Sequence, residues 1–300
     1  MFKIAYHSSY VHPLPNGHRF PMVKYELIAA QLRYEAVVPD TAFFTPEPAD
    51  LETISLAHVR EYCSQLLHLT LPSAMIRRIG FPLSEQLIAR ELRIVQGTIT
   101  GCRFAMEDGV AFNVAGGTHH AGSDWGEGFC LLNDQAIAAC DLLHRGASKQ
   151  VLIIDLDVHQ GNGTAEIFNG EPRVFTFSMH GRNNFPFHKE HSDLDISLAD
   201  GTSDREYLET LEQQLDVIFE KVKPDFVFYQ SGVDVLSTDK LGRLNLSRAG
   251  CRRRDELVFN KCLQANVPLQ VSMGGGYSPQ VRDIVDAHCN TFKAAVHFFD

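Results

Sequence analysis

Residues 151–163, VLIIDLDVHQGNG, constrain the fold more than any other stretch of this chain. An apolar run without glycine or proline is typical of a parallel strand that is covered on both faces. The run leads into Asp155, Asp157 and His159, which alternation along an extended chain places on one side. Buried carboxylates without a partner are unfavourable, so a divalent metal ion bound by oxygen and nitrogen explains the cluster better than a strand end with solvated acids.

The remaining segments predict one domain over residues 1–300. Strand and helix patterns alternate throughout, which predicts a single three-layer α/β domain with a mostly parallel central sheet flanked by helices. Further strands are expected at residues 2–6, 111–115, 173–179, 225–230 and 267–273, with helices at 21–35, 133–145, 203–223 and 247–265 and after Ser84 and Ser278. Ser203 and Glu206 have the spacing of a capping box. The arginine run at residues 252–254 is expected to be solvated.

Composition limits the partners and the compartment. With 300 residues and 44% hydrophobic content, the chain is long enough for one large core. The formal net charge of −10 argues against nucleic-acid and acidic-membrane partners. Seven cysteines without paired spacing fit a reduced protein, and no signal-peptide or membrane-span pattern is present, so a cytoplasmic location is expected. The sequence leaves the oligomeric state open.

Polar residues follow four of the expected strands. His119 and His120 come after residues 111–115, Asp234 follows 225–230, and Tyr277 follows 267–273. In parallel α/β sheets, functional sites form beyond the carboxyl ends of the strands. These side chains and the cluster at residues 155–159 should therefore meet, and their types indicate metal and proton-transfer chemistry.

Five motifs have the content and order of a known family. They are GGTHHA at 116–121, GFCLLND at 128–134, DLDVHQGNG at 155–163, QSGVD at 230–234 and GGGY at 274–277. The set resembles the histone deacetylase family of the arginase–deacetylase superfamily, and the resemblance covers nearly the whole chain. It implies that fold and a zinc-dependent amidohydrolase, which removes acetyl or longer acyl groups from lysine ε-amines of proteins or peptides.

The resemblance implies roles for the polar residues. Asp157, His159 and Asp234 match three ligands of one catalytic zinc ion, with a fourth position open for water and substrate; iron(II) is the alternative ion. His119 and His120 match tandem histidines that hold the attacking water, with His120 donating a proton to the leaving amine.

Further matches concern the oxyanion and a second ion. Tyr277 matches a tyrosine that stabilises the tetrahedral oxyanion. Asp155 matches a carboxylate that orients His119 and that forms a structural potassium site with Ser178 and Met179.

The substrate pocket is implied in the same way. Phe129 and Gly128 match one wall of an acyl-lysine tunnel, and Phe185 is expected in the opposite wall. Gly275 is expected to contact the substrate, and Arg19 matches an arginine at the foot of the acyl pocket, although its spacing alone suggests a solvated side chain.

Departures from the commonest pattern indicate a branch of the family. Asn162 stands where class I enzymes have an aspartate, which should make His120 harder to protonate. Thr238 replaces a common glycine, and with the segment at residues 78–81 these features resemble class IV and its bacterial relatives. That branch implies that fatty acyl groups are accepted in preference to acetyl.

Three alternatives are weighed. A binuclear manganese ureohydrolase of the arginase type would need more ligands than Gln160, Gly161 and Asn162 provide. A catalytically inactive acyl-lysine binding module would be expected to lack a ligand, a histidine or the tyrosine, and none is missing. A deacylase of small acylated amines such as acetylpolyamines would use the same catalytic residues and stays open.

Overall fold

The computed structural model describes residues 1–299, and its centre is an eight-stranded sheet in the order β2-β1-β3-β8-β7-β4-β5-β6. Every pairing in the sheet is parallel, which confirms and sharpens the predicted mostly parallel sheet. The strands are β1 (Lys3–Ala5), β2 (Phe43–Phe44), β3 (Val110–Asn113), β4 (Val151–Asp155), β5 (Val174–Gly181), β6 (Leu194–Leu198), β7 (Phe226–Gln230) and β8 (Leu269–Ser272).

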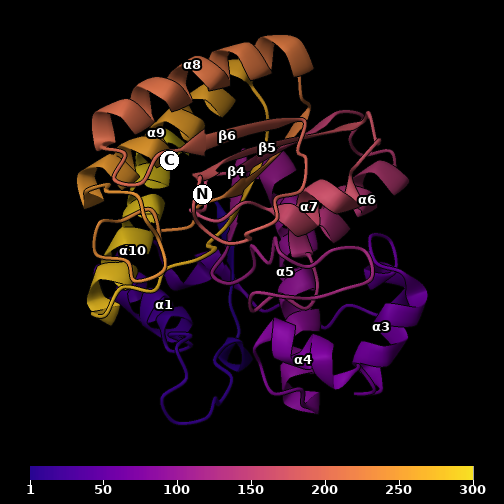
Figure 1. Ribbon diagram of the computed structural model, residues 1–300. Coiled ribbons are helices and arrows are strands. Elements are labelled where there is room, and N and C mark those ends of the chain that lie inside the picture. Colours follow the sequence, from indigo (N-terminus) through magenta and orange to yellow (C-terminus); the bar gives the residue numbers. More distant parts are fainter. Residues whose placement is uncertain (300) are drawn as a thin grey trace.

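Helices cover both faces of the sheet. Figure 1 shows α1 (Lys24–Tyr34), α8 (Asp204–Val222), α9 (Arg248–Ala265) and α10 (Val281–Phe299) on one side. The other side carries α5 (Glu85–Asp108), α6 (Asp134–His144) and α7 (Asn162–Ile167), with α3 (Arg60–Leu67) and α4 (Ser73–Ile79) further out. The short helix α2 (Leu51–Ile54) contacts α3 and α6. This is the predicted three-layer arrangement. No helix over residues 1–299 combines the length and the apolar character needed to cross a membrane.

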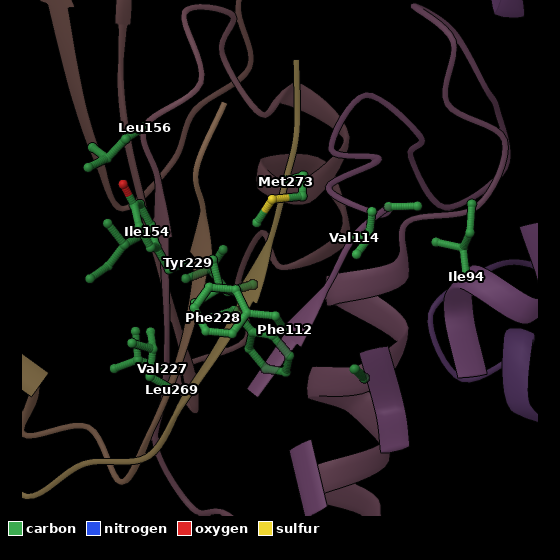
Figure 2. Packing of buried hydrophobic residues seen from close by; sticks show 14 of the residues in the cluster. Ile94, Phe112, Val114, Ile154, Leu156, Val227, Phe228, Tyr229, Leu269 and Met273 are labelled. Atoms are coloured by element: carbon green, nitrogen blue, oxygen red, sulfur yellow. The ribbon is translucent and has the colours of Figure 1, made fainter. Parts of the chain in front are cut away.

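The central strands are buried on both faces, as their continuous apolar sequences predict. Every residue of β4 and β7 is buried, and the two strands pair in register from Val151 and Phe226 onward. Figure 2 shows side chains from several strands in one apolar core, among them Phe112, Ile154 and Leu269. The core therefore fixes where each strand ends and where the loops carrying the motifs begin.

Helix starts were predicted with mixed success. Ser84 caps α5 by accepting from the Leu87 amide, and Ser247 caps α9 through the Gly250 amide. The predicted capping box at Ser203 is wrong, because its side chain makes no capping bond although α8 begins there. The neighbouring Asp204 carboxylate accepts instead from the amide and hydroxyl of Ser247.

The prediction of a solvated arginine run is wrong for Arg254. Arg252 and Arg253 are exposed, whereas Arg254 is fully buried and is paired with Asp255. The guanidinium of Arg254 donates to the carbonyl oxygens of Leu156, Ser231 and Gly232, in the loops that follow β4 and β7. These loops therefore rest on a buried cation.

His58 connects the α2–α3 segment to the loops beyond β3. Its Nδ1 donates to the Gly122 carbonyl, 2.8 Å away, because its Nε2 accepts from the Asn133 amide at 2.9 Å. Both ring nitrogens are therefore used by the neutral form. Burial lowers the pKa of His58 to about 4, although the carbonyls of Gly122 and Ser123 oppose the shift.

His58 should make stability depend on pH. Its folded pKa lies below the usual 6.5, so its contribution is fully present above pH 6.5 and is lost as the pH falls toward 4. The free energy of unfolding should be measured by urea titration at pH 8 and pH 5 for wild type and His58→Gln. The difference in this free energy between the two proteins should be about 2 kcal/mol smaller at pH 5 than at pH 8. A gap that is the same at both pH values would contradict this role.

Candidate metal-dependent active site

Three predicted ligands meet beyond the ends of β4 and β7. One ligand atom from each of Asp157, His159 and Asp234 lies within 4.8 Å of the other two, and all three residues are buried. His159 Nδ1 lies 2.9 Å from Asp157 Oδ1 and 3.1 Å from Asp234 Oδ2. Two carboxylates and one imidazole facing a common point form the donor set of an open catalytic zinc site.

The backbone holds these carboxylates in place. Asp157 Oδ2 accepts from the Gly275 amide at 2.8 Å, and Asp234 Oδ1 accepts from the Val158 amide at 2.9 Å. Asp234 Oδ2 is buried and accepts no hydrogen bond. A Cβ at Gly275 would lie 2.0 Å from this oxygen, so only glycine fits against the cluster. A buried carboxylate oxygen without a donor fits a site for a cation.

The charges of the cluster also require a positive partner. Burial raises the pKa of Asp234 to about 7, and the neighbouring Asp157 adds to the shift. Burial alone would lower the pKa of His159, but its hydrogen bond to Asp157 and the negative charges of Asp157 and Asp234 raise it to about 10. A proton on His159 thus takes the place that a divalent ion would fill between the carboxylates.

His119 and His120 lie beside the ligands with different partners. Their ring centroids are 4.1 Å apart. His119 Nδ1 is 2.6 Å from Asp155 Oδ2, and burial would lower its pKa, but the charge of Asp155 raises it overall. The Asp155 carboxylate therefore favours the charged form of His119.

His120 has an amide partner instead. Its Nδ1 is 2.6 Å from Asn162 Oδ1, while Asn162 Nδ2 donates to Glu127 Oε1 and Arg78 pairs with the same carboxylate at 2.7 Å. An amide oxygen only accepts, so His120 carries its proton on Nδ1. Burial, followed by the charge of His119, lowers the pKa of His120 well below its usual value, and the hydrogen bond with Asn162 opposes this shift only in part.

Tyr277 approaches the cluster from the loop after β8. Its amide donates to Asp239 Oδ2 at 2.6 Å, and its ring centroid lies 6.3 Å from that of His159. Burial and the charge of Asp234 raise the pKa of its phenol well above 10. The phenol therefore keeps its proton.

Lys24 is hydrogen-bonded to the loop that carries Tyr277. It is fully buried on α1, and its Nζ donates to the Gly274 carbonyl at 2.9 Å and lies 5.7 Å from the centre of the Tyr277 ring. Burial lowers its pKa to about 8, opposed by the charge of Asp234. Sequence reasoning missed Lys24, although its spacing from the buried Ile28 and Leu32 of α1 places it on the same helix face.

Two cavities open from the cluster. The outer one has a volume of about 370 Å³ and is lined by both Phe129 and Phe185, the two predicted tunnel walls. The Phe185 ring lies edge-on to His120 at 4.9 Å. Gly128 lines both cavities with φ +57°, and a Cβ there would lie 2.7 Å from His120 Cδ2. The aromatic residues therefore lead from the surface to the histidines.

The comparisons with known proteins agree with this geometry. Residues 18–292 match the histone deacetylase domain. An uncharacterized protein of Picosynechococcus is 44% identical over 98% of both chains, and histone deacetylase 2 of Arabidopsis thaliana is 30% identical over 87% of this chain and 70% of its own. The chain belongs to the histone deacetylase family. This membership makes it a hydrolytic deacetylase.

Solved structures support the fold. The crystal structure of the HDA15 HD domain has a TM-score of 0.82 and 21% identity, over 99% of this chain and 88% of that one. The crystal structure of a histone deacetylase homologue complexed with SAHA also has a TM-score of 0.82, with 24% sequence identity. The match covers 98% of this chain and 84% of that one. The arginase–deacetylase fold predicted from the motifs is therefore confirmed.

The prediction for Arg19 is wrong in its location. Arg19 lines the outer cavity, with its Cζ 4.9 Å from the centre of the Phe129 ring, and it is not among the residues that line the inner cavity. The arginine in the inner cavity is Arg90 of α5, which is buried, pairs with Glu91 and donates to the Tyr10 carbonyl. Its spacing of four from the buried Ile94 is the sequence signal for this position.

The residues predicted to bind potassium lie in two neighbouring strands of the sheet. Asp155 and Ser178 are directly paired across β4 and β5, and Met179 follows in the same buried strand. The Ser178 hydroxyl, however, lies 3.0 Å from His180 Nδ1. The potassium site therefore stays a prediction.

Loss of one carboxylate should abolish metal binding. We expect purified wild-type protein to hold one divalent ion per chain and Asp157→Ala to hold none. The two ligands that remain in the variant carry only one negative charge, which does not neutralise a divalent ion. Elemental analysis after dialysis measures this, and Asp216→Ala, an exposed carboxylate on α8, is the control. Two tightly held ions per wild-type chain would contradict a mononuclear site.

Proposed function

We propose that this protein is a zinc-dependent amidohydrolase that removes acetyl groups from lysine ε-amines of proteins or peptides. The observation that carries the proposal is the convergence of Asp157, His159 and Asp234 with two differently paired histidines at the end of an aromatic-lined cavity. Zinc at these ligands, with iron(II) as the alternative ion, would polarise the amide carbonyl and acidify a water molecule.

The two histidines would divide the proton transfers. With its proton held on Nδ1 by Asn162, neutral His120 has a free lone pair on Nε2 that accepts a proton from the attacking water. Its lowered pKa then makes the same group a ready proton donor to the leaving amine. His119, paired with Asp155, would orient the water and keep its charge.

Tyr277 would supply the oxyanion contact. Its phenol is protonated, lines both cavities and lies beside His159, so it can donate to the oxygen that becomes negative during the attack. Lys24 and Asp239 would fix the loop that carries it.

The inner cavity favours a short acyl group. Its volume of about 40 Å³ holds little more than one or two water-sized groups. Phe81, Ile94 and Arg90 line it, so each added methylene would meet a packed wall. This geometry supports acetyl rather than the fatty acyl chains that the class IV resemblance implies.

The test of the function is an acyl series on one peptide. We expect kcat/KM to fall from acetyl through butanoyl to octanoyl lysine, and chelation to abolish turnover until zinc or iron(II) is added back. A rise along the series would overturn the acetyl preference. Full activity after exhaustive chelation would overturn the metal-dependent mechanism.

Removal of the Tyr277 hydroxyl should affect the transition state more than binding. Tyr277→Phe is expected to lower kcat by about 10²–10³, with KM and metal content little changed. Tyr34→Phe, which alters an exposed tyrosine on α1, is the matched control. Activity within threefold of wild type would remove Tyr277 from the mechanism.

A further inference from the structure

The mouth of the outer cavity is basic in a chain that is acidic as a whole. Arg19, Arg78 and Arg243 line it, and no aspartate or glutamate is among its lining residues. The chain as a whole has a formal charge of −10. The arginines come from three separate segments, so the rim is formed by the fold and not by a local charge run.

Arg19 differs from the other two arginines. Arg78 is 2.7 Å from Glu127, and Arg243 is 3.3 Å from Asp200. Within residues 1–299, Arg19 has no carboxylate partner, and its side chain is exposed and stacked on Phe129. A guanidinium that stacks through its face keeps its N–H edge free for a carboxylate.

We infer that Arg19 and the arginine rim bind a carboxylate that lies next to the acyl-lysine of the substrate. This inference rests on the proposed function. An acyl-lysine side chain that passes between Phe129 and Phe185 leaves its own backbone over the outer cavity. The neighbouring groups of the substrate then lie within reach of Arg19.

The rim thereby separates the substrate classes that the catalytic residues cannot distinguish. Basic histone-like tails and acetylpolyamines bring positive charge to Arg19, whose own charge no carboxylate of residues 1–299 offsets, and this is unfavourable. Peptides with glutamate or aspartate beside the acetyl-lysine, or acetyl-lysine with a free carboxylate, bring the complementary charge. Salt should weaken this preference because the rim is open to solvent.

The experiment measures kcat/KM for matched substrates. One arm uses peptides of equal length in which acetyl-lysine is flanked by glutamate, glutamine or lysine. A second arm compares Nε-acetyl-lysine that is blocked on its α-amine and carries a free or an amidated carboxylate, and a third uses acetylspermidine. The proteins are wild type, Arg19→Gln, Arg19→Glu and Arg205→Gln, an exposed control on α8.

Wild type should prefer the glutamate-flanked over the lysine-flanked peptide by about three- to tenfold at low salt. Arg19→Gln should reduce this ratio, Arg19→Glu should invert it, and Arg205→Gln should leave it unchanged. If the ratio of kcat/KM values in the first arm depends on Arg19, the ligand is an acidic side chain of the substrate. If the ratio in the second arm depends on Arg19, the ligand is the α-carboxylate of the acetyl-lysine itself.

Three results would overturn the inference. If the ratios are close to one, or are the same in Arg19→Gln and wild type, the rim does not select charge, although turnover of the glutamine-flanked peptide would still support the proposed function. If acetylspermidine is the best substrate, the rim is not a carboxylate site. If no acetyl-lysine substrate is turned over, the proposed function fails and the inference falls with it.

Discussion

The repulsion between two buried carboxylates governs the architecture of the site. Asp157 and Asp234 face each other without solvent, and burial together with Asp157 raises the pKa of Asp234 to about 7. The surrounding structure supplies positive charge and donors around them. Lys24 donates to the loop that carries Tyr277, and Arg254 donates to the loops that carry the ligands. Backbone amides donate to one oxygen of each carboxylate. A divalent ion would complete an arrangement that the protein alone leaves electrostatically unbalanced.

The strands and the ligand set could be predicted because both depend on local, repetitive signals. A fully buried strand such as β4 is apolar throughout, and carboxyl ends of parallel strands always lie on one edge. It follows that Asp157 and Asp234, far apart in the chain, had to be close in space. The edge strand β2 was missed because it has only two residues, and β6, with five, was missed although its alternating polar and apolar residues are typical of a half-buried strand.

The depth of the pocket could not be predicted, because it depends on how loops and long side chains fill space. Arg19 lies on a loop, and no residue pattern specifies that its side chain lines the outer rather than the inner cavity. Arg90 and Arg254 were missed for another reason. Each lies on the buried face of a helix, where a charged residue is uncommon unless paired, and each is neutralised by the next residue in sequence, Glu91 or Asp255. In the sequence alone, such a pair of adjacent opposite charges looks like part of a solvent-exposed helix face. Only the packing of the helix against the sheet shows that the pair is buried.

The order of the strands has a consequence for synthesis of the chain. The loops that build the site follow β3, β8, β7 and β4, which are adjacent in the sheet, yet β8 is the last strand to be made and it lies between β3 and β7. Until the ribosome has released the segment through Tyr277, the two halves of the sheet have no strand to join them, and Asp157 lacks its bond from Gly275. Formation of the ligand cluster and closure of the sheet are thus completed together and late, by contacts between residues far apart in sequence.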